Sequence, residues 1–550
     1  MKPLFNLFIF FWMLSGTLEM AAGAIVIRTQ NTCLVYQIND KNKVCQSYYG
    51  KALDAADCEL VPVSNDEILL TFGTNYVHQP AVRAVHSDGN TSTELVFDRS
   101  EVRRLNDNQV QTDIYLKDTY FPFYVKVSFQ TYEKEDIIAQ WTEYSHGESG
   151  RVTLYDFASS CLSFRANDYY MTQFYGNWAD EMHLRETRLP RGITTVDSKL
   201  GVRSNEYAHA LFYMALDKPA EETSGRIVGG ALAWPGSFAL NFSIDNQDKL
   251  RIITGINSFA GQYLLEKGET LATPALLYTY SDEGKGIISR RFHRWARQYG
   301  VYHGAKPHLT LMNNWEATYF DFNSQVLTGI IDDAAQMGFD LFLLDDGWFG
   351  TKYPRNNDDA GLGDWEVNRT KLPEGLGYLV QECSKRNIQF GIWLEPEMVN
   401  PQSELYEKHP DWVITQPHRP LDLSRNQLIL DLCNPKVQDY VFGIVDKTLT
   451  ETPGIAYVKW DCNRFITNSG SFYLSKDKQS HLWIEYTRGL MKVLKRVREK
   501  YPDLIIMGCS GGGGRIDYGT LPYFDEFWVS DNTDALDRIY IQWGVGQFFP

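Results

Sequence analysis

Acidic residues follow short apolar runs at several places in the second half of the chain. In the segment Tyr457–Asn463, YVKWDCN, the residues Lys459, Asp461 and Asn463 alternate. Alternate residues of a strand point to one face, so these three side chains are expected to point together, with Asp461 at the strand end. A carboxylate beside an ammonium group stays ionised, which suits a nucleophile, although a structural Lys–Asp pair has the same spacing.

A second acidic cluster, Ser530–Asp534, closes another apolar run. Two nearby carboxylates raise the pKa of one of them, which makes that group a proton donor. The alternative is a helix cap, in which Asp531 or Asn532 starts a helix over Ala535–Ile541. One carboxylate as nucleophile and another as acid and base is the arrangement of a retaining glycosidase, with the two groups about 5–5.5 Å apart.

Two further acidic pairs lie at similar positions. Asp345 and Asp346 follow four apolar residues and could bind vicinal hydroxyls or a metal, or simply cap a turn. No histidine lies nearby and no D-x-D-x-D-G calcium loop is present, which weakens the metal hypothesis. Glu395 and Glu397 form a third acidic strand end, for which a structural salt-bridged pair is an equal alternative.

The segment Ser510–Arg515 contains four consecutive glycines. It lacks the G-K-[ST] ending of a phosphate-binding loop, so a nucleotide site of that kind is excluded. A glycine run lets the backbone approach a ligand closely, and a flexible turn is the alternative. Tryptophans near the strand ends favour an aromatic-lined pocket, although a tryptophan is more often part of a core. They are Trp315, Trp348, Trp365 and Trp393.

Alternating strands and helices after Lys306 must position these residues. Six strands are predicted, at His308–Asn313, Leu341–Asp346, Phe390–Glu397, Tyr457–Asp461, Leu504–Ser510 and Phe527–Asp531. Helices are predicted at Val326–Met337, Leu376–Arg386, Val437–Leu449 and Leu482–Lys500. This order predicts a parallel sheet, and polar residues at the carboxyl ends of its strands favour a (β/α)8-type barrel. A doubly wound sheet is less favoured, because no G-x-G-x-x-G motif lies where a dinucleotide fold needs it.

The first half of the chain has a strand pattern without helices. From about Ile25 to Tyr280, stretches of β-branched, aromatic and polar residues alternate with Asn-, Asp- and Gly-rich turns. This predicts a β-sandwich domain over residues 25–283, a connecting helix over residues 284–305 and the barrel over residues 306–550. Because only six barrel strands are counted, the barrel is expected to be incomplete, with unpaired edges.

The chain has 550 residues, 43% of them hydrophobic, and a net charge of −16. These values predict a folded protein, and the acidic surface argues against general nucleic-acid binding. Lys2, the apolar run Leu4–Leu14 and the small residues up to Ala24 predict a signal peptide over residues 1–24, with a buried helix as the alternative. The protein is therefore expected in the periplasm or outside the cell. No later stretch is long and apolar enough to span a bilayer.

Eight cysteines are present without a C-x-x-C pair, so zinc ribbons and thioredoxin-like motifs are not supported. Export permits disulfides. Cys33, Cys45 and Cys58 could bridge locally, but their spacing does not give the pairing.

Six motifs together resemble glycoside hydrolase family 36, and its α-galactosidases in particular. They are Asn313–Thr318, Leu344–Gly350, Trp393–Met398, Lys459–Arg464, Cys509–Arg515 and Ser530–Ala535. They stand in the family's order and cover the barrel closely and the N-terminal part more loosely. The resemblance implies a β-sandwich before the barrel, and retaining hydrolysis of terminal α-galactosides such as melibiose or raffinose. It also implies that neither a metal nor an organic cofactor is needed.

The resemblance implies roles for individual residues. Asp461 matches the nucleophile that forms the galactosyl-enzyme, and Asp531 matches the acid/base, with Asp534 as the second choice. Asp345 and Asp346 match the pair that binds galactose hydroxyls, including the axial O4. The remaining matches are sugar-pocket positions: Trp315, Trp393, Arg425, Lys459, Asn463, Cys509 and Gly512.

The sequence departs from the family pattern in two ways. Cys462 stands where the family commonly has Met. The family's barrel has eight strands and is followed by a β-domain, whereas only six barrel strands are counted in this sequence. An inactive fragment that binds carbohydrate is therefore an alternative function. An α-N-acetylgalactosaminidase or a galactosyltransferase is another. Family members often form oligomers, although no feature of this sequence fixes the number of subunits.

Overall fold

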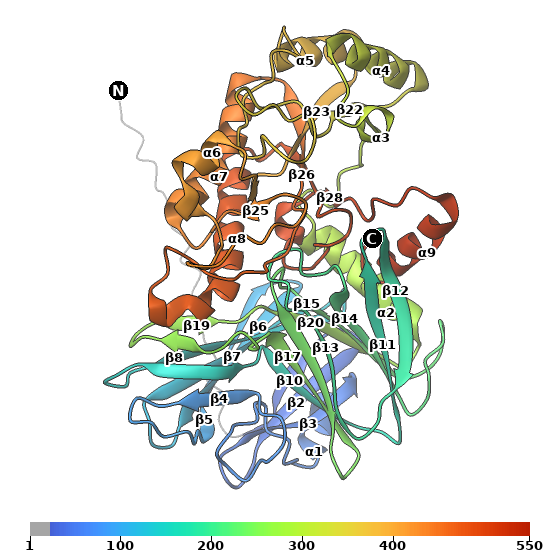
Figure 1. Ribbon diagram of the computed structural model, residues 1–550. Helices are drawn as coiled ribbons and strands as arrows, with labels where there is room; N and C mark the ends of the chain where they lie inside the picture. The colour runs from blue at the N-terminus through green and yellow to red at the C-terminus, as the bar shows by residue number, and fades with distance from the viewer. Residues whose placement is uncertain (1–22) are drawn as a thin grey trace, which may run out of the picture.

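The computed structural model describes residues 23–550. An N-terminal region made almost wholly of strands lies against a C-terminal region in which helices flank a parallel sheet (Figure 1). This order of a β-domain followed by a β/α barrel confirms the predicted fold class. The predicted signal peptide lies outside the described residues except for its last two residues. Within residues 23–550, no helix combines the length and the apolar character that a membrane crossing needs.

The N-terminal region is built around a ten-stranded antiparallel sheet. Its main path runs β12 (Asp180–Arg188), β11 (Tyr169–Asn177), β14 (Ala208–Leu216), β15 (Ile227–Leu232), β20 (Leu276–Ser281), β8 (Ile137–His146), β7 (Phe123–Tyr132), β6 (Gln109–Asp118) and β5 (Leu95–Asn106), and β19 (Thr270–Ala272) pairs with β8. A four-stranded sheet has the order β10 (Ser160–Arg165), β17 (Lys249–Ile256), β16 (Phe238–Ile244) and β13 (Gly192–Asp197).

Two three-stranded sheets complete this region. The first contains β1 (Ile25–Arg28), β2 (Thr32–Ile38) and β3 (Val44–Lys51). The second contains β18 (Tyr263–Leu265), β9 (Val152–Phe157) and β4 (Val82–Val85). A short helix, α1 (Ala55–Leu60), follows β3.

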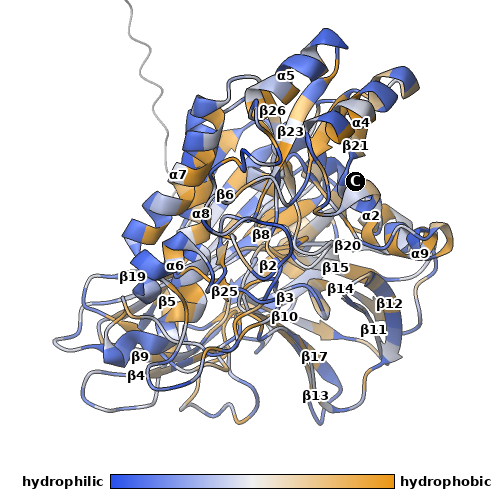
Figure 2. Cartoon of the chain, turned by 45° about the horizontal axis from the view of Figure 1, so that its top comes forward, coloured by the Kyte–Doolittle hydropathy of each residue, from blue (hydrophilic) through white to orange (hydrophobic). Residues whose placement is uncertain are grey.

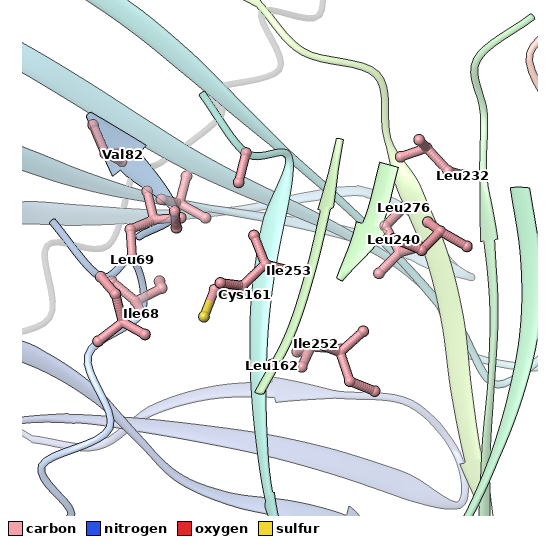
Figure 3. Packing of buried hydrophobic residues seen from close by; sticks show 14 of the residues in the cluster. Ile68, Leu69, Val82, Cys161, Leu162, Leu232, Leu240, Ile252, Ile253 and Leu276 are labelled. Carbon is pink, nitrogen blue, oxygen red and sulfur yellow. The ribbon is translucent and has the colours of Figure 1, made fainter. Parts of the chain in front are cut away.

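The sheets of this region share one hydrophobic core. Alternate residues of β7 between Phe123 and Phe129 are buried, as expected for a strand with one face on a core. Leu240 and Ile252 come from the four-stranded sheet. Leu232 and Leu276 come from the ten-stranded sheet, and Figure 3 shows all four in the same cluster. Two layers of sheet around a common core make the β-sandwich that the sequence predicts.

A connecting helix, α2 (Lys285–Trp295), continues as one π-helical turn, η1 (Ala296–Gly300). Its Phe292 is buried and packs edge-on against Tyr518, with ring centroids 5.5 Å apart. Because Tyr518 belongs to the C-terminal region, α2 joins the two regions by packing as well as by chain connection. The domain boundaries predicted at residues 283 and 305 stay predictions.

The C-terminal region holds a curled sheet of six parallel strands in chain order. They are β21 (Leu311–Asn313), β22 (Leu341–Leu344), β23 (Gln389–Leu394), β26 (Ile455–Trp460), β27 (Ile505–Gly508) and β28 (Glu526–Phe527). All six predicted strands are therefore present. In the part of the chain that the structure describes, β21 and β28 pair on one side only, so the sheet forms a partial barrel, as predicted.

Helices and short turns connect these strands. The helices are α3 (Trp315–Thr318), α4 (Ser324–Met337), α5 (Leu376–Lys385), α6 (Glu404–Lys408), α7 (Pro435–Glu451), α8 (Leu482–Lys500) and α9 (Ala535–Val545). The 3-10 turns are η2 (Pro410–Trp412), η3 (Lys476–His481) and η4 (Leu521–Tyr523), and β24 (Met398–Val399) pairs with β25 (Leu428–Ile429).

Local sequence sets the ends of these helices. Asn434 caps α7 by accepting a hydrogen bond from the backbone N–H of Lys436, and Pro435 occupies the first helical position. Gly338 ends α4 with a φ of 79°, a left-handed conformation that glycine adopts without strain. Figure 2 shows the two-sided character of α7 and α8 as bands of hydrophobic and hydrophilic residues.

Successive side chains of β26 point to opposite faces of the sheet. Val458 and Trp460 pack in the core beneath the helices. Tyr457 belongs to a separate cluster on the concave side. Because strand side chains alternate, Lys459 and Asp461 follow Tyr457 to the concave side.

Candidate active site

A cavity of about 1020 Å³ lies at the carboxyl ends of the parallel strands. This volume is at the upper end of the range for small-molecule sites. Both regions of the chain line it, because Trp178 and Arg203 come from the N-terminal region. Four of the residues predicted from the sequence also line it: Trp315, Arg425, Lys459 and Asp531.

Asp461 lies directly after β26 and is only 6% exposed. Its Oδ1 accepts hydrogen bonds from the backbone N–H groups of Cys462 at 2.8 Å and Gly511 at 3.1 Å. Its Oδ2 accepts one from Trp393 Nε1 at 3.0 Å. Burial alone raises the pKa of Asp461, but the charge of Lys459 and these hydrogen bonds lower it to about 2. The carboxylate is therefore ionised at neutral pH.

Lys459 connects Asp461 to the first aspartate pair. Its Nζ lies 2.8 Å from Asp345 Oδ2, which also accepts a hydrogen bond from Asn313 Nδ2 at 2.6 Å. The Asn463 side chain lies near Asp461 and helps to lower the pKa of its carboxyl. The Oδ1 of Asn463 is buried and accepts no hydrogen bond from the described residues, so it is free to accept one from a ligand. The structure therefore brings Lys459, Asp461 and Asn463 together.

Asp346 forms its ion pair with a different basic side chain from that of Asp345. Arg355 forms a forked pair with it, with Nη2 2.8 Å from Oδ2 and Nε 3.0 Å from Oδ1. Arg355 is itself fixed by a 3.1 Å hydrogen bond to Asn400 Oδ1. Both aspartates are thus held by separate positive charges, an arrangement that leaves their remaining lone pairs for hydroxyl donors.

Asp531 follows β28 and is half-buried. Its Oδ1 accepts a hydrogen bond from Trp528 Nε1 and its Oδ2 accepts one from Trp178 Nε1, both at 3.0 Å. The helix cap lies three residues further on, because Asp534 accepts from the backbone N–H groups that open α9. The expectation that Asp531 or Asn532 caps this helix is therefore wrong.

The glycine loop after β27 is held by the N-terminal region. Arg203 Nε donates to the backbone oxygen of Ser510 at 3.0 Å. Gly512 has a φ of 85°, and a Cβ there would lie 2.6 Å from Glu181 Oε1 and 2.8 Å from the backbone nitrogen of Asp531. Any larger residue would meet these atoms, so the loop is a close backbone approach.

Cys509 is buried directly after β27, and its N–H donates to the backbone oxygen of Trp460 at 2.8 Å. Burial raises the pKa of its thiol, and the negative charges of Asp461 and Asp531 raise it further.

Of the other predicted positions, Trp315 begins α3, where its N–H donates to Asn313 Oδ1 at 2.7 Å. Arg425 is exposed at the cavity wall, with a φ of 51°.

The expectation that four tryptophans mark the pocket is wrong for two of them. Trp348 is 1% exposed, and its Nε1 donates to the backbone oxygen of Trp393 at 3.1 Å. Trp365 packs on Phe349 with ring centroids 4.5 Å apart. Both residues contact Trp393, which donates to Asp461, and of these four tryptophans Trp315 alone lines the cavity.

The two glutamates of the third acidic strand end have different environments. Glu397 forms a forked pair with Arg515, at 2.8 and 3.0 Å, and is a structural residue, as one of the two hypotheses held. Glu395 Oε1 instead accepts hydrogen bonds from Gln427 Nε2 at 2.9 Å and the Asn463 N–H at 2.6 Å. Burial, and then the charge of Asp461, raise the pKa of Glu395 to about 7.

Replacing Glu395 by Gln is expected to flatten the pH dependence of stability between pH 4.5 and 7. The folded protein keeps the Glu395 proton in this window and the unfolded chain releases it, because the pKa rises from 4.5 to about 7 on folding. The wild-type protein therefore loses stability as the pH rises, by at most about 1.4 kcal/mol per pH unit. Gln can accept the same hydrogen bonds without titrating. Thermal midpoints measured near each end of the window test this, and equal slopes for the two proteins would contradict it.

Several residues of the site were not predicted from the sequence. Arg355 lies in a long loop, and the sequence indicates Glu395 only as part of an acidic strand end, without a specific role. Trp178, Glu181 and Arg203 belong to the N-terminal region. Nothing in the local sequence indicates that the β11–β12 hairpin and the segment between β13 and β14 reach the barrel rim, so only the folded structure reveals these residues.

Comparisons with known proteins agree with this geometry. The Melibiase family model matches residues 270–550, and the glycosyl hydrolase family 36 N-terminal domain model matches residues 42–266. Alpha-galactosidase AgaA of Geobacillus stearothermophilus is 35% identical to this chain over 496 residues, which cover 87% of this chain and 67% of that protein.

Two further relatives extend the comparison. The bifunctional alpha-galactosidase/sucrose kinase AgaSK of Mediterraneibacter gnavus is 34% identical and matches 87% of this chain and 51% of its own length. The chain thus spans between about half and two thirds of the length of these curated relatives. A crystal structure of a variant of AgaA in complex with raffinose superposes with a TM-score of 0.90 and 32% identity, covering 96% of this chain and 78% of that one.

Proposed function

Because the chain belongs to glycoside hydrolase family 36, we propose that it hydrolyses terminal α-galactosides such as melibiose and raffinose with retention of configuration. The observation that carries this proposal is the ionised Asp461, held by three N–H donors within reach of the charge of Lys459. The glycine loop brings Asp461 and Asp531 to the same place, which supports two carboxyl groups acting on one bond. The Gly511 N–H donates to Asp461 at 3.1 Å, and a Cβ on Gly512 would lie 2.8 Å from the backbone nitrogen of Asp531.

The reaction has two steps. In the first, an Asp461 oxygen bonds to the anomeric carbon, the bond from that carbon to the leaving oxygen breaks, and Asp531 donates its proton to that oxygen. In the second, Asp531 takes a proton from water, the water oxygen bonds to the anomeric carbon, and Asp461 is released.

The surroundings of Asp461 suit the transition state of this reaction. Positive charge develops on the sugar ring, and the nearby carboxylates of Asp345 and Asp346 are fixed before the substrate arrives, so they stabilise that charge without rearranging. The same two side chains can accept hydrogen bonds from sugar hydroxyls. The Asn463 Oδ1 offers one further acceptor.

The test is hydrolysis by the purified full chain. We expect turnover of nitrophenyl α-galactoside, melibiose and raffinose, with nitrophenyl β-galactoside as the negative control. Proton NMR during the first minutes should detect α-galactose before mutarotation produces the β-anomer. First-formed β-galactose would contradict retention, and galactose binding without turnover would instead support a carbohydrate-binding protein.

A further inference from the structure

A small hydrophobic cluster lies at the start of the β-sandwich, apart from the main cores. It contains Ala24, Cys33, Val35 and Cys58. Cys33 belongs to β2 and Cys58 to α1, and both are 0% exposed. Cys58 is the only buried residue of α1, so the helix is oriented by the side chain that enters this cluster.

Two independent contacts, made by Arg28 and by Leu53, show that the two cysteine side chains are neighbours. Arg28 of β1 lies directly opposite Cys33 in the sheet, and its Nη2 donates to Cys58 Sγ at 3.5 Å. Cys33 Sγ accepts a hydrogen bond from the N–H of Leu53, at 3.4 Å, just before the helix that carries Cys58. Both side chains also pack in the same small hydrophobic cluster.

The third cysteine of this region has other neighbours. Cys45 Sγ accepts from Asn39 Nδ2 at 3.5 Å and contacts the backbone oxygen of Lys43 at 3.8 Å. The charges that act on its thiol come from Asp66, Glu67, Lys43 and Lys249. The three local cysteines are therefore a facing pair and a separate residue, a distinction that their spacing in the sequence cannot give.

We propose that Cys33 and Cys58 form a disulfide that ties α1 to β2. Each thiol loses a proton and the pair loses two electrons to a disulfide oxidant, such as glutathione disulfide or a thiol–disulfide oxidoreductase, which leaves as two thiols. The expected export would bring the chain to a compartment where such oxidants are present. Because both sulfurs are buried in the folded protein, the bond forms while the chain folds.

Arg28 supports this chemistry. Burial raises the pKa of Cys33, and Cys58 raises it further, whereas the Leu53 N–H and the charge of Arg28 lower it. The Leu53 N–H and the guanidinium thus offset part of the effect of burial, which still leaves the pKa of Cys33 raised overall. After the bond forms, the chain between the two residues, which includes β3, is closed into a loop, and this restricts the unfolded state.

Peptide mapping of the full chain tests the proposal directly. The protein is refolded with glutathione disulfide, denatured, alkylated without reductant, digested and analysed by mass spectrometry. We expect the peptides of Cys33 and Cys58 to be linked, and the peptide of Cys45 to carry the alkyl group. Alkylation of Cys33 and Cys58 as free thiols, or a link to Cys45, would overturn the proposal.

Variants add a stability readout that does not depend on activity. Cys58→Ala should lower the first thermal unfolding midpoint by roughly 5–10 °C, and a reductant should lower that of the wild-type protein by a similar amount while leaving the variant unchanged. The matched control, Cys45→Ala, should keep both the linked peptides and the response to reductant. A reductant effect of equal size in Cys58→Ala and wild type would contradict the pairing. Loss of the link with full α-galactosidase turnover would leave the proposed function standing.

Discussion

Asp461→Asn is expected to lower kcat for every α-galactoside by at least about 10⁴-fold, as the removal of a nucleophile does in other hydrolases. The amide cannot form the bond to the anomeric carbon that the first step requires. The fold should persist, because the Asn oxygen can still accept the hydrogen bonds that Cys462 and Gly511 donate. The matched control is Asp503→Asn, which changes an exposed carboxylate before β27 at the opposite end of the sheet and should leave kcat unchanged.

Rescue by an external nucleophile separates a chemical role for Asp461 from a structural one. Asp461→Gly leaves space beside Trp393, and sodium azide should restore turnover of a nitrophenyl galactoside. The product should be the β-galactosyl azide, because azide attacks from the face that the carboxylate occupied. Turnover of Asp461→Asn near the wild-type rate would exclude Asp461 as the nucleophile.

Asp531→Asn is expected to have an effect that depends on the leaving group. Loss of general acid catalysis lowers rates by about 10²–10⁴-fold when the departing oxygen needs a proton, as in melibiose and raffinose. Dinitrophenolate leaves without a proton, so formation of the galactosyl-enzyme from the dinitrophenyl galactoside should change little. Presteady-state measurement should therefore show a burst of dinitrophenolate, followed by slow release of galactose.

Asp534→Asn is the matched control for Asp531. Asp534 accepts hydrogen bonds from the N–H groups of Leu536 and Asp537 at the start of α9, and Asn is also a good helix cap. Its rates should stay near the wild-type values for all leaving groups. If Asp534→Asn gave the burst and Asp531→Asn did not, the acid/base assignment would move to Asp534.

The elements of the barrel could be predicted from the sequence because their signals are local. The apolar run Leu341–Leu344 is a strand whatever surrounds it, and the prediction erred only in extending it to Asp346. That strand ends at Leu344, and Asp345 donates its N–H to the side chain of Asn314, a residue of another strand end. Strand ends depend on such tertiary contacts, which periodicity does not contain.

Site residues that lie on one strand could be predicted from the sequence. Site residues that meet only through contacts between distant parts of the chain could not. Lys459, Asp461 and Asn463 lie together because a strand has a period of two. The helix cap at Asp534 was missed because several Asx residues in a row satisfy the same rule. Trp178 could not be predicted, because a hydrogen bond between residues 353 positions apart in the chain leaves no local pattern.

The hydrogen bond from Trp178 to Asp531 has a consequence for how this architecture can change in evolution. The hairpin between β11 and β12 is inherited with the β-sandwich, yet one of its side chains touches a carboxylate at the rim of the barrel. Recombination that exchanged one domain and kept the other would pair Trp178 or Asp531 with a partner domain that did not evolve with it. The two domains are therefore expected to be inherited together. Phylogenetic trees built separately from the β-sandwich and from the barrel should have the same branching order.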